Sequence, residues 1–247
     1  MTRTLSEGRG IMFLESLERR RLCTTVVQGY PGFFEVYGDD GDNEISIDVS
    51  VDGGSFTLDG QLFQGVQQIA VYGLGGNDLI MVSAIPGSSI SASIDGGDGD
   101  DILSLNFDGA VRGGGGNDRI YLYDSFRGEA YGGSGDDYIW ISGGCVDAFV
   151  NGDDGDDWID ASSNFYKVFI HGGEGNDVIF GSSFDDHLFG DGGNNAIYGM
   201  GGSDKIYIRN GSYDCADGGG DAGDMCYCDR TPEFQDSVSG FENVFYG

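Results

Sequence analysis

Acidic turns rich in glycine recur along this chain and are its clearest chemical feature. The chain has 247 residues, of which 47 are glycine, and its 33 aspartates outnumber its 9 glutamates. Aspartate and glycine favour turns, whereas glutamate favours helices. Carboxylate and backbone carbonyl oxygens are the ligands that hard divalent cations prefer. The composition therefore predicts short apolar strands joined by tight turns able to hold a cation, with no long helix after residue 30.

The acidic turns repeat in register from residue 73 onward. The copy at 113–120 reads Gly-Gly-Gly-Gly-Asn-Asp-Arg-Ile, and the copy at 172–179 reads Gly-Gly-Glu-Gly-Asn-Asp-Val-Ile. The last aspartates of successive turns lie 23, 17, 19, 20 and 20 residues apart, and the spacing then falls to 9 three times, with Asn195 filling one aspartate position. Since two nonamers fill about one coil, we expect a two-sided solenoid with one acidic edge that becomes two-edged near its end.

The residues that follow each turn aspartate predict which side chains form the core. Side chains alternate between two faces along a strand. The second position after the aspartate is always Ile or Leu, whereas the first is mixed. A uniform aliphatic column beside a mixed one indicates a core column beside a surface column. The expected core column is Ile80, Leu103, Ile120, Ile139, Ile159, Ile179, Leu188, Ile197 and Ile206.

The repeated unit resembles the Gly-Gly-x-Gly-x-Asp-x-(aliphatic)-x nonapeptide of RTX, or hemolysin-type, calcium-binding proteins. The resemblance covers about residues 73–207 and, more loosely, 38–247. It implies an all-β fold, a right-handed parallel β-roll or β-solenoid with calcium-binding turns. In that family each ion lies between the turns of adjacent coils and shares their aspartate carboxylates and backbone carbonyls. The alternative is that the Gly-Asp turns are only good turn formers, with acids for solubility.

The resemblance implies two groups of calcium ligands and several bound ions, about six to eight for turns of this coordination type. Asn43 and Asn195 lack the carboxylate, and Ser182, Ser183 and Phe184 stand where glycines are expected, so we expect weak or empty sites there. The implied carboxylate ligands are Asp78, Asp101, Asp118, Asp137, Asp157, Asp177, Asp186 and Asp204. The implied turn ligands are Gly73, Gly75, Gly96, Asp98, Gly113, Gly115, Gly132, Ser134, Gly152, Asp154, Gly172 and Glu174.

The chain divides into four predicted segments. Residues 1–30 are a leader-like segment, because Phe13 to Leu22 resembles the Leu-Glu-x-Arg-x-Leu leader of exported proteins in planctomycete-type bacteria; an amphipathic helix is the alternative. Residues 31–72 alternate in polarity around Asp52-Gly53-Gly54, which predicts a hairpin and an antiparallel N-terminal cap. Residues 73–210 form the β-roll. Residues 211–247 form a C-terminal cap with a closing strand.

Charge and missing motifs narrow the class of partner. A formal net charge of −30 opposes binding to nucleic acid or anionic membranes, and no apolar run is long enough for a membrane span. The two histidines, His171 and His187, belong to no zinc protease motif, and no serine hydrolase or phosphate-binding motif is present. We therefore expect no enzyme. A polysaccharide-active enzyme is the last-ranked alternative, because acids outside the turns are sparse.

The sequence favours an exported calcium-binding β-roll that serves as a structural, surface or matrix component outside the cell. The alternative is a glycan-binding adhesin or self-assembling fibre subunit, which would use aromatic side chains expected on the outside of the strands. Cys215 with Cys226 or Cys228 is a candidate disulfide, and small buried apolar residues are an equal alternative. The expected outward aromatic column is Tyr121, Trp140, Phe180, Phe189, Tyr198 and Tyr207.

Calcium should control folding, which gives a first prediction. Acidic turns stacked one strand spacing apart lie well inside the Debye length of about 8 Å, so they repel one another without a cation. Binding free energy then becomes folding free energy. We expect a chelator to abolish the β signal in circular dichroism and millimolar calcium to restore it. A full β signal in the chelated chain would contradict this mechanism.

Overall fold

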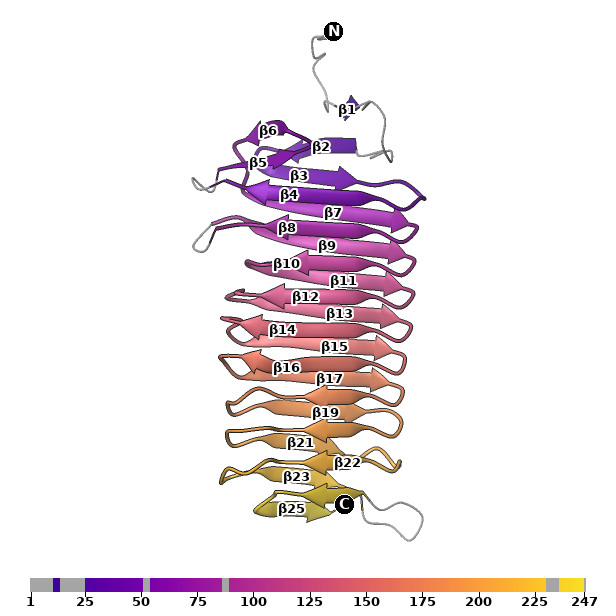
Figure 1. Cartoon of the computed structure of the whole chain (residues 1–247), viewed down its shortest axis with the longest axis vertical. Coiled ribbons are helices and arrows are strands. Elements are labelled where there is room, and N and C mark those ends of the chain that lie inside the picture. The colour runs from indigo at the N-terminus through magenta and orange to yellow at the C-terminus, as the bar shows by residue number, and fades with distance from the viewer. Residues whose placement is uncertain (1–10, 14–24, 51–53, 86–88, 230–235, 247) are drawn as a thin grey trace.

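The computed structural model describes residues 11–13, 25–50, 54–85, 89–229 and 236–246, and all their regular elements are strands that form two long sheets facing each other (Figure 1). Sheet A contains β1 (Ile11–Phe13), β2 (Thr25–Tyr30), β3 (Phe33–Tyr37), β7 (Gln68–Gly75), β9 (Ser91–Asp98), β11 (Gly109–Gly115), β13 (Gly128–Ser134), β15 (Ala148–Asp154), β17 (Val168–Glu174), β19 (His187–Asp191), β21 (Lys205–Ile208), β23 (Met225–Cys228) and β25 (Asn243–Tyr246). Sheet B contains β24 (Ser237–Ser239), β22 (Cys215–Asp217), β20 (Ala196–Tyr198), β18 (Val178–Phe180), β16 (Trp158–Asn164), β14 (Tyr138–Gly143), β12 (Arg119–Tyr123), β10 (Ile102–Leu105), β8 (Leu79–Ser83), β4 (Glu44–Val49), β5 (Ser55–Leu58) and β6 (Gln61–Gln64).

The chain winds through these sheets as a parallel β-solenoid, which confirms the predicted fold class. Each coil places one strand in sheet A and the next in sheet B, and successive coils pair in parallel register. The described part of the chain contains no helix of the length and apolarity needed to cross a membrane.

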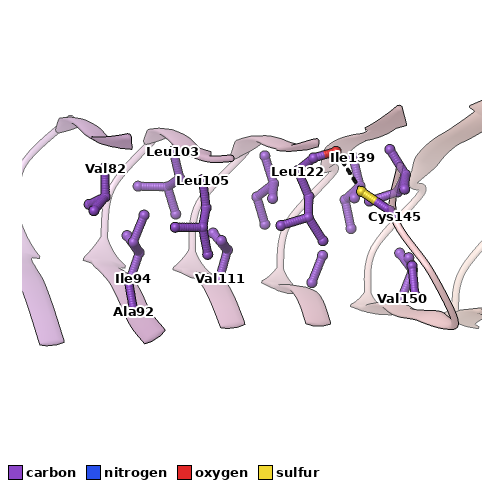
Figure 2. Packing of buried hydrophobic residues seen from close by; sticks show 14 of the residues in the cluster. Val82, Ala92, Ile94, Leu103, Leu105, Val111, Leu122, Ile139, Cys145 and Val150 are labelled. Atoms are coloured by element: carbon purple, nitrogen blue, oxygen red, sulfur yellow. Dashed lines mark hydrogen bonds between the residues drawn. The ribbon is translucent and has the colours of Figure 1, made fainter. Parts of the chain in front are cut away.

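The predicted aliphatic column forms the core between the sheets. Ile120 pairs with Leu103 of the preceding coil and Ile139 of the next. All nine members of the column are fully buried. Seven of them lie on sheet B, where side chains from sheet A, including Ile94, Val111 and Val150, face them across the interior (Figure 2). Leu188 and Ile206 lie on sheet A, because the late nonamers alternate between the two sheets. The strict alternation of core and surface positions therefore follows from the sequence pattern.

Acidic turns occupy one edge of the solenoid at first and both edges later, as expected. We call the turns that lead from sheet A to sheet B the first edge, and those that lead back the second edge. The turns ending at Asp78 through Asp177, and that ending at Asn195, lie on the first edge. The turns ending at Asp186 and Asp204 lie on the second edge.

Antiparallel strands occur at the N-terminal end. β2 pairs with β3, and β4 pairs with β5 as the predicted hairpin, although residues 51–53 of its turn lie outside the described ranges. β3 and β4 also pair in parallel with β7 and β8, so this segment begins the first coil. Of the leader-like motif, only Phe13 falls within the described ranges.

The coils continue through the segment predicted as a C-terminal cap. β22 and β24 extend sheet B, and β23 and β25 extend sheet A, all in parallel register. Cys226 pairs with Ile206 in the core column and is fully buried, as is Cys228. Cys215 is exposed on the other sheet, and all three are free thiols. The buried pair therefore replaces aliphatic residues.

The expected aromatic column is outward-facing but does not form a single column. Tyr121, Trp140, Phe180 and Tyr198 lie on sheet B, whereas Phe189 and Tyr207 lie on sheet A. The two groups separate because the late nonamers alternate between edges. On sheet A the aromatic ladder is longer than expected and consists of His171, Phe189, Tyr207, Tyr227 and Phe245.

Ile120 and Ile102 lie on opposite faces of sheet B, so substituting each one compares the stability contributed by a core position with that of a surface position. Ile120 is fully buried, whereas Ile102 is 37% exposed on the outer face of the same sheet. We expect Ile120→Ala to lower the free energy of unfolding of the calcium-loaded chain by about 2 to 5 kcal/mol, because it leaves a cavity. Ile102→Ala should cost less than half as much. Urea denaturation measures both, and equal losses would contradict the assignment of the two faces.

Candidate metal centre

A buried ladder of aspartate and asparagine side chains runs along the first edge and joins each coil to the next. One side-chain oxygen of each member after the first accepts the backbone N–H of the corresponding member in the preceding coil. Asp118 N–H thus donates to Asp137 Oδ1 at 2.7 Å, and Asp137 N–H donates to Asp157 Oδ1 at 2.8 Å. We call this the inner ladder. Its members are Asn43, Asp78, Asp101, Asp118, Asp137, Asp157, Asp177, Asn195, Asp214 and Asp236.

The second edge carries a shorter ladder of the same kind. Val168 N–H donates to Asp186 Oδ1 at 2.8 Å, Asp186 N–H to Asp204 Oδ1 at 2.9 Å, and Asp204 N–H to Asp224 Oδ1 at 2.8 Å. The ladder begins at the coil where the sequence spacing falls to nine residues. The change in spacing therefore marks a second ladder on the opposite edge.

From Asp42 to Asn194, the residue before each inner-ladder member forms an exposed outer ladder with the opposite direction of donation. Asn117 N–H donates back to Asp100 Oδ1 at 2.8 Å, and Asp136 N–H donates back to Asn117 Oδ1 at 3.0 Å. Only one acceptor oxygen is needed here, which Asn and Asp both supply. This explains why the two residue types interchange at this position.

Glycines shape the turn for two different reasons. In the turn that ends at Asp137, Gly133 and Gly135 have φ angles of 118° and 120°, which L side chains rarely adopt. Gly132, the first residue, is required for space, because a Cβ there would overlap both Asp137 Oδ2 and the carbonyl oxygen of Gly152 in the next coil. A carboxylate oxygen and a neighbouring carbonyl thus converge beside the first glycine.

The second carboxylate oxygen of most ladder aspartates is buried and has no hydrogen-bond donor. A buried charged oxygen without a partner is costly. These oxygens recur at the same place in successive turns, so each of these turns lacks the same hydrogen-bond donor. We call them the orphan oxygens, and they are Oδ2 of Asp78, Asp101, Asp118, Asp137, Asp157, Asp177, Asp204, Asp214 and Asp224.

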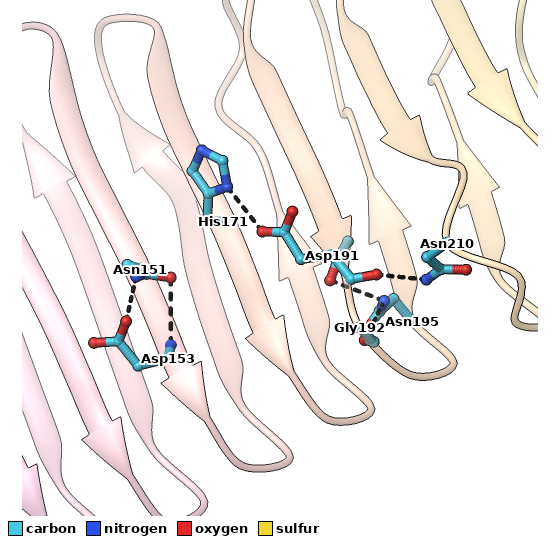
Figure 3. Close-up of polar contacts among 8 residues, drawn as sticks. Asn151, Asp153, His171, Asp191, Gly192, Asn195 and Asn210 are labelled. Atoms are coloured by element: carbon cyan, nitrogen blue, oxygen red, sulfur yellow. Dashed lines mark hydrogen bonds and ion pairs between the residues drawn. The ribbon is translucent and has the colours of Figure 1, made fainter.

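The asparagine turns show what such an oxygen faces. Asn195 Nδ2 donates to the carbonyl oxygens of Gly190 at 2.9 Å and Gly192 at 3.0 Å; the second bond is drawn in Figure 3. Asn43 Nδ2 likewise donates to carbonyls of its own turn, those of Asp39 and Gly41. Turn carbonyls therefore point at the side chain. Where Asp replaces Asn, acceptor faces acceptor, and only a proton or a cation can satisfy both.

Burial accordingly disfavours ionisation of the ladder aspartates in the absence of a cation. Burial raises the pKa of Asp101, Asp118 and Asp137 to about 7, and that of Asp157 and Asp204 to about 8. Neighbouring carboxylates add a smaller rise at these five positions, whereas each backbone N–H bond lowers the pKa. A bound cation would reverse this balance.

Asp186 differs from the other implied carboxylate ligands. The sequence pattern also missed two aspartates, Asp214 and Asp224, that are equivalent to those ligands in the structure. Asp186 accepts Ser182 N–H and the Ser182 hydroxyl, so its oxygens are satisfied within the chain. Asp214 and Asp224 have the same orphan oxygen as the implied ligands. Their spacings of 19 and 20 residues from Asn195 and Asp204 were the available signal. This signal was obscured because Ala216 and Cys226 stand at the second position after the aspartate, where the turns ending at Asp78 through Asp204 have Ile or Leu.

The implied turn ligands fall into two groups. Those at the first position lie beside the orphan carboxylate oxygens and are Gly73, Gly96, Gly113, Gly132, Gly152 and Gly172. Those at the third position lie further along the bend and are Gly75, Asp98, Gly115, Ser134, Asp154 and Glu174. The carbonyls of Gly115, Ser134, Asp154 and Glu174 accept a glycine N–H from the preceding coil at 2.6 to 2.8 Å.

The donor set suits calcium. In the described ranges no three His, Cys, Asp or Glu side chains gather closely enough to hold a metal ion by themselves. An ion at these turns would thus need carbonyl oxygens beside the carboxylates, which is the donor set of calcium, a cation that takes roughly six to eight oxygens. Registered orphan carboxylates and inward carbonyls supply both kinds of ligand.

Comparison with protein families agrees with this chemistry. The RTX calcium-binding nonapeptide repeat matches four copies in the chain, at residues 110–125, 129–144, 149–164 and 171–206. The chain carries RTX calcium-binding repeats. No curated protein shows a significant match to it. The turns that end at Asp78 and Asp101 lie outside the matched RTX copies yet carry the same orphan oxygens.

A neighbouring pair of aspartates isolates the role of the orphan oxygen. Asp137→Asn keeps the Oδ1 acceptor and puts an amide where Asn195 has one, so the turn should satisfy itself. We expect this variant to bind less calcium and to need less calcium to fold. The matched control, Asp136→Asn, removes the same charge from the outer ladder, where asparagine already occurs. Calorimetric calcium titration should show a loss for Asp137→Asn only, and equal losses would contradict the assignment.

Acid should partly replace calcium. Eight of the ladder aspartates, among them Asp101, Asp177 and Asp204, have a folded-state pKa of about 6 to 8, above the ordinary value of 3.8, so the folded chain holds more protons than the unfolded chain within this window. The calcium-free fold should therefore be most stable below pH 4 and lose stability as the pH rises towards 8. Chelated samples at pH 5 should show more β signal than at pH 8. The reverse order would contradict the buried state of these carboxylates.

Proposed function

We propose that the chain is an exported protein that folds when calcium binds between the turns of adjacent coils, and that it serves as a structural component of a cell surface or extracellular matrix. The observation that carries the proposal is the contrast between the two turn types. Asparagine turns close their own carbonyls with an amide, whereas aspartate turns hold an orphan oxygen against theirs.

The proposed ions lie along both ladders. Each would join the orphan oxygen of one coil to carbonyls at the adjoining first-position glycines. Asp186 and Asp236 are the exceptions, because Ser182 donates to Asp186 and the Asp229 N–H donates to Asp236 Oδ2. The proposed carboxylate ligands are Asp78, Asp101, Asp118, Asp137, Asp157, Asp177, Asp204, Asp214 and Asp224.

Calcium availability connects this chemistry to a location. Extracellular calcium modules work at about 10⁻⁴ to 10⁻³ M, whereas cytosolic sensors work at far lower concentrations. A net charge of −30 and repeated acidic turns favour an expanded chain wherever calcium is scarce. The chain would then stay unfolded before export and fold afterwards.

A structural role fits the placement of the histidines. His171 Nδ1 lies 2.8 Å from Asp191 Oδ2 on the outside of sheet A, and the His187 ring lies 4.8 Å from the Phe169 ring on the same face. Both are engaged in surface contacts between coils. We assign no catalytic role to either.

The aromatic ladder favours stiffening of the roll over glycan binding. Its rings stack on each other at centroid distances of 4.4 to 5.0 Å and interplanar angles of 3 to 15°. Sugars bind aromatic side chains through exposed ring faces, and here those faces contact the rings of neighbouring coils. The glycan-binding alternative therefore receives less support than a structural role in which the stacked rings stiffen the roll.

Small-angle X-ray scattering during a calcium titration tests the proposal. We expect an expanded chain at micromolar calcium and a rod at millimolar calcium, and the full-length protein should be recovered outside the cells that make it. A compact rod at micromolar calcium, or retention of the folded protein inside the cell, would overturn it.

A further inference from the structure

From Arg112 onward, the outward column of sheet A is a series of flat side chains with one interruption; Asp95 precedes Arg112 in the column and separates it from Tyr72. From His171 onward the aromatic ladder is continuous. At the other end of the series, the guanidinium of Arg112 lies 4.9 Å from the centre of the Tyr131 ring, so this column already accepts a planar cation as a member. Asn151 interrupts the series. In register order the column is Arg112, Tyr131, Asn151, His171, Phe189, Tyr207, Tyr227 and Phe245.

Asn151 does not extend the stack. Its amide lies along its own strand, where Nδ2 donates to Asp153 Oδ1 and Oδ1 accepts Asp153 N–H (Figure 3). His171 stacks face to face with Phe189 on one side, at 4.4 Å and 3°. On its other side Phe149 is tilted by 40° at 5.8 Å. The ring face of His171 towards Asn151 is therefore only partly covered.

A groove of about 520 Å³ opens at this position. Phe149, Asn151 and His171 line it, and its volume lies in the usual range for small-molecule sites. Four carboxylates line the groove; His171 Nδ1 lies against one of them, Asp191, and the charge of Arg112 acts on Asp153, so the groove keeps a negative potential. The acidic lining residues are Asp153, Asp154, Glu174 and Asp191.

We propose that this groove binds the guanidinium group of a small arginine-type ligand. The planar cation stacks on the partly covered face of His171, beside Phe149, and donates to the surrounding carboxylates. Guanidinium combines aromatic stacking with paired hydrogen bonds to carboxylates, which a lysine ammonium does not. Arg112 on Tyr131 is the internal precedent for the stacking contact. The site uses side chains and contains no member of the inner ladder; Asp154 and Glu174 are also implied turn ligands, but there their backbone carbonyls are engaged.

Calorimetric titration of the calcium-loaded chain with arginine methyl ester tests the proposal, with lysine methyl ester as the probe of equal charge. We expect saturable binding at one site and an affinity about tenfold higher for the arginine ester, which corresponds to one favourable cation–π contact. Equal affinities, which would indicate charge attraction alone, or the absence of saturable binding would overturn it.

Substitutions locate the site. Asn151→Tyr completes the aromatic series and should weaken binding of the arginine ester at least about tenfold with an unchanged β spectrum. Asp191→Asn removes one lining carboxylate and should also weaken it, which keeps the test valid if the tyrosine variant folds poorly. Asp59→Asn removes an equal charge from the exposed turn between β5 and β6 and should leave binding unchanged. Unaltered affinity in both groove variants would overturn the assignment.

Discussion

A buried carboxylate oxygen that faces backbone carbonyls is the constraint on which the rest of this structure depends. Two acceptors cannot satisfy each other, so each aspartate turn needs a positive species between them. The chain repeats this arrangement in successive coils, at the edge where the two sheets are joined. The strands and their aliphatic core supply the regular spacing that keeps the turns in register.

The turns differ in what satisfies the second polar atom of the ladder side chain. The Asn195 amide donates to carbonyls of its own turn, and the oxygens of Asp186 accept the Ser182 hydroxyl and N–H. Asp137 Oδ2 receives no hydrogen bond from the chain. All three keep the one acceptor that joins adjacent coils. Inter-coil bonding is therefore independent of the turn type, whereas the need for a cation is set residue by residue.

The sequence predicted the coils, the core column and the edges well, because these depend on strict periodicity. It predicted the aspartates that carry an orphan oxygen less completely. Asp214 and Asp224 were missed because Ala216 and Cys226 replace the larger aliphatic residues that define the pattern. Asp186 was grouped with the implied ligands, although Ser182, Ser183 and Phe184 in its turn already indicated a weak or empty site there. The aromatic column was expected on one face, since a column defined by local spacing does not say which sheet each nonamer enters.

Anomalous X-ray scattering from crystals grown in calcium tests the central claim most directly. We expect calcium peaks beside the orphan oxygens of the inner ladder, such as those of Asp118, Asp137 and Asp157, and none at the asparagine turns ending at Asn43 and Asn195. Peaks of equal height at the asparagine turns, or an ordered roll without calcium at any aspartate turn at neutral pH, would contradict it.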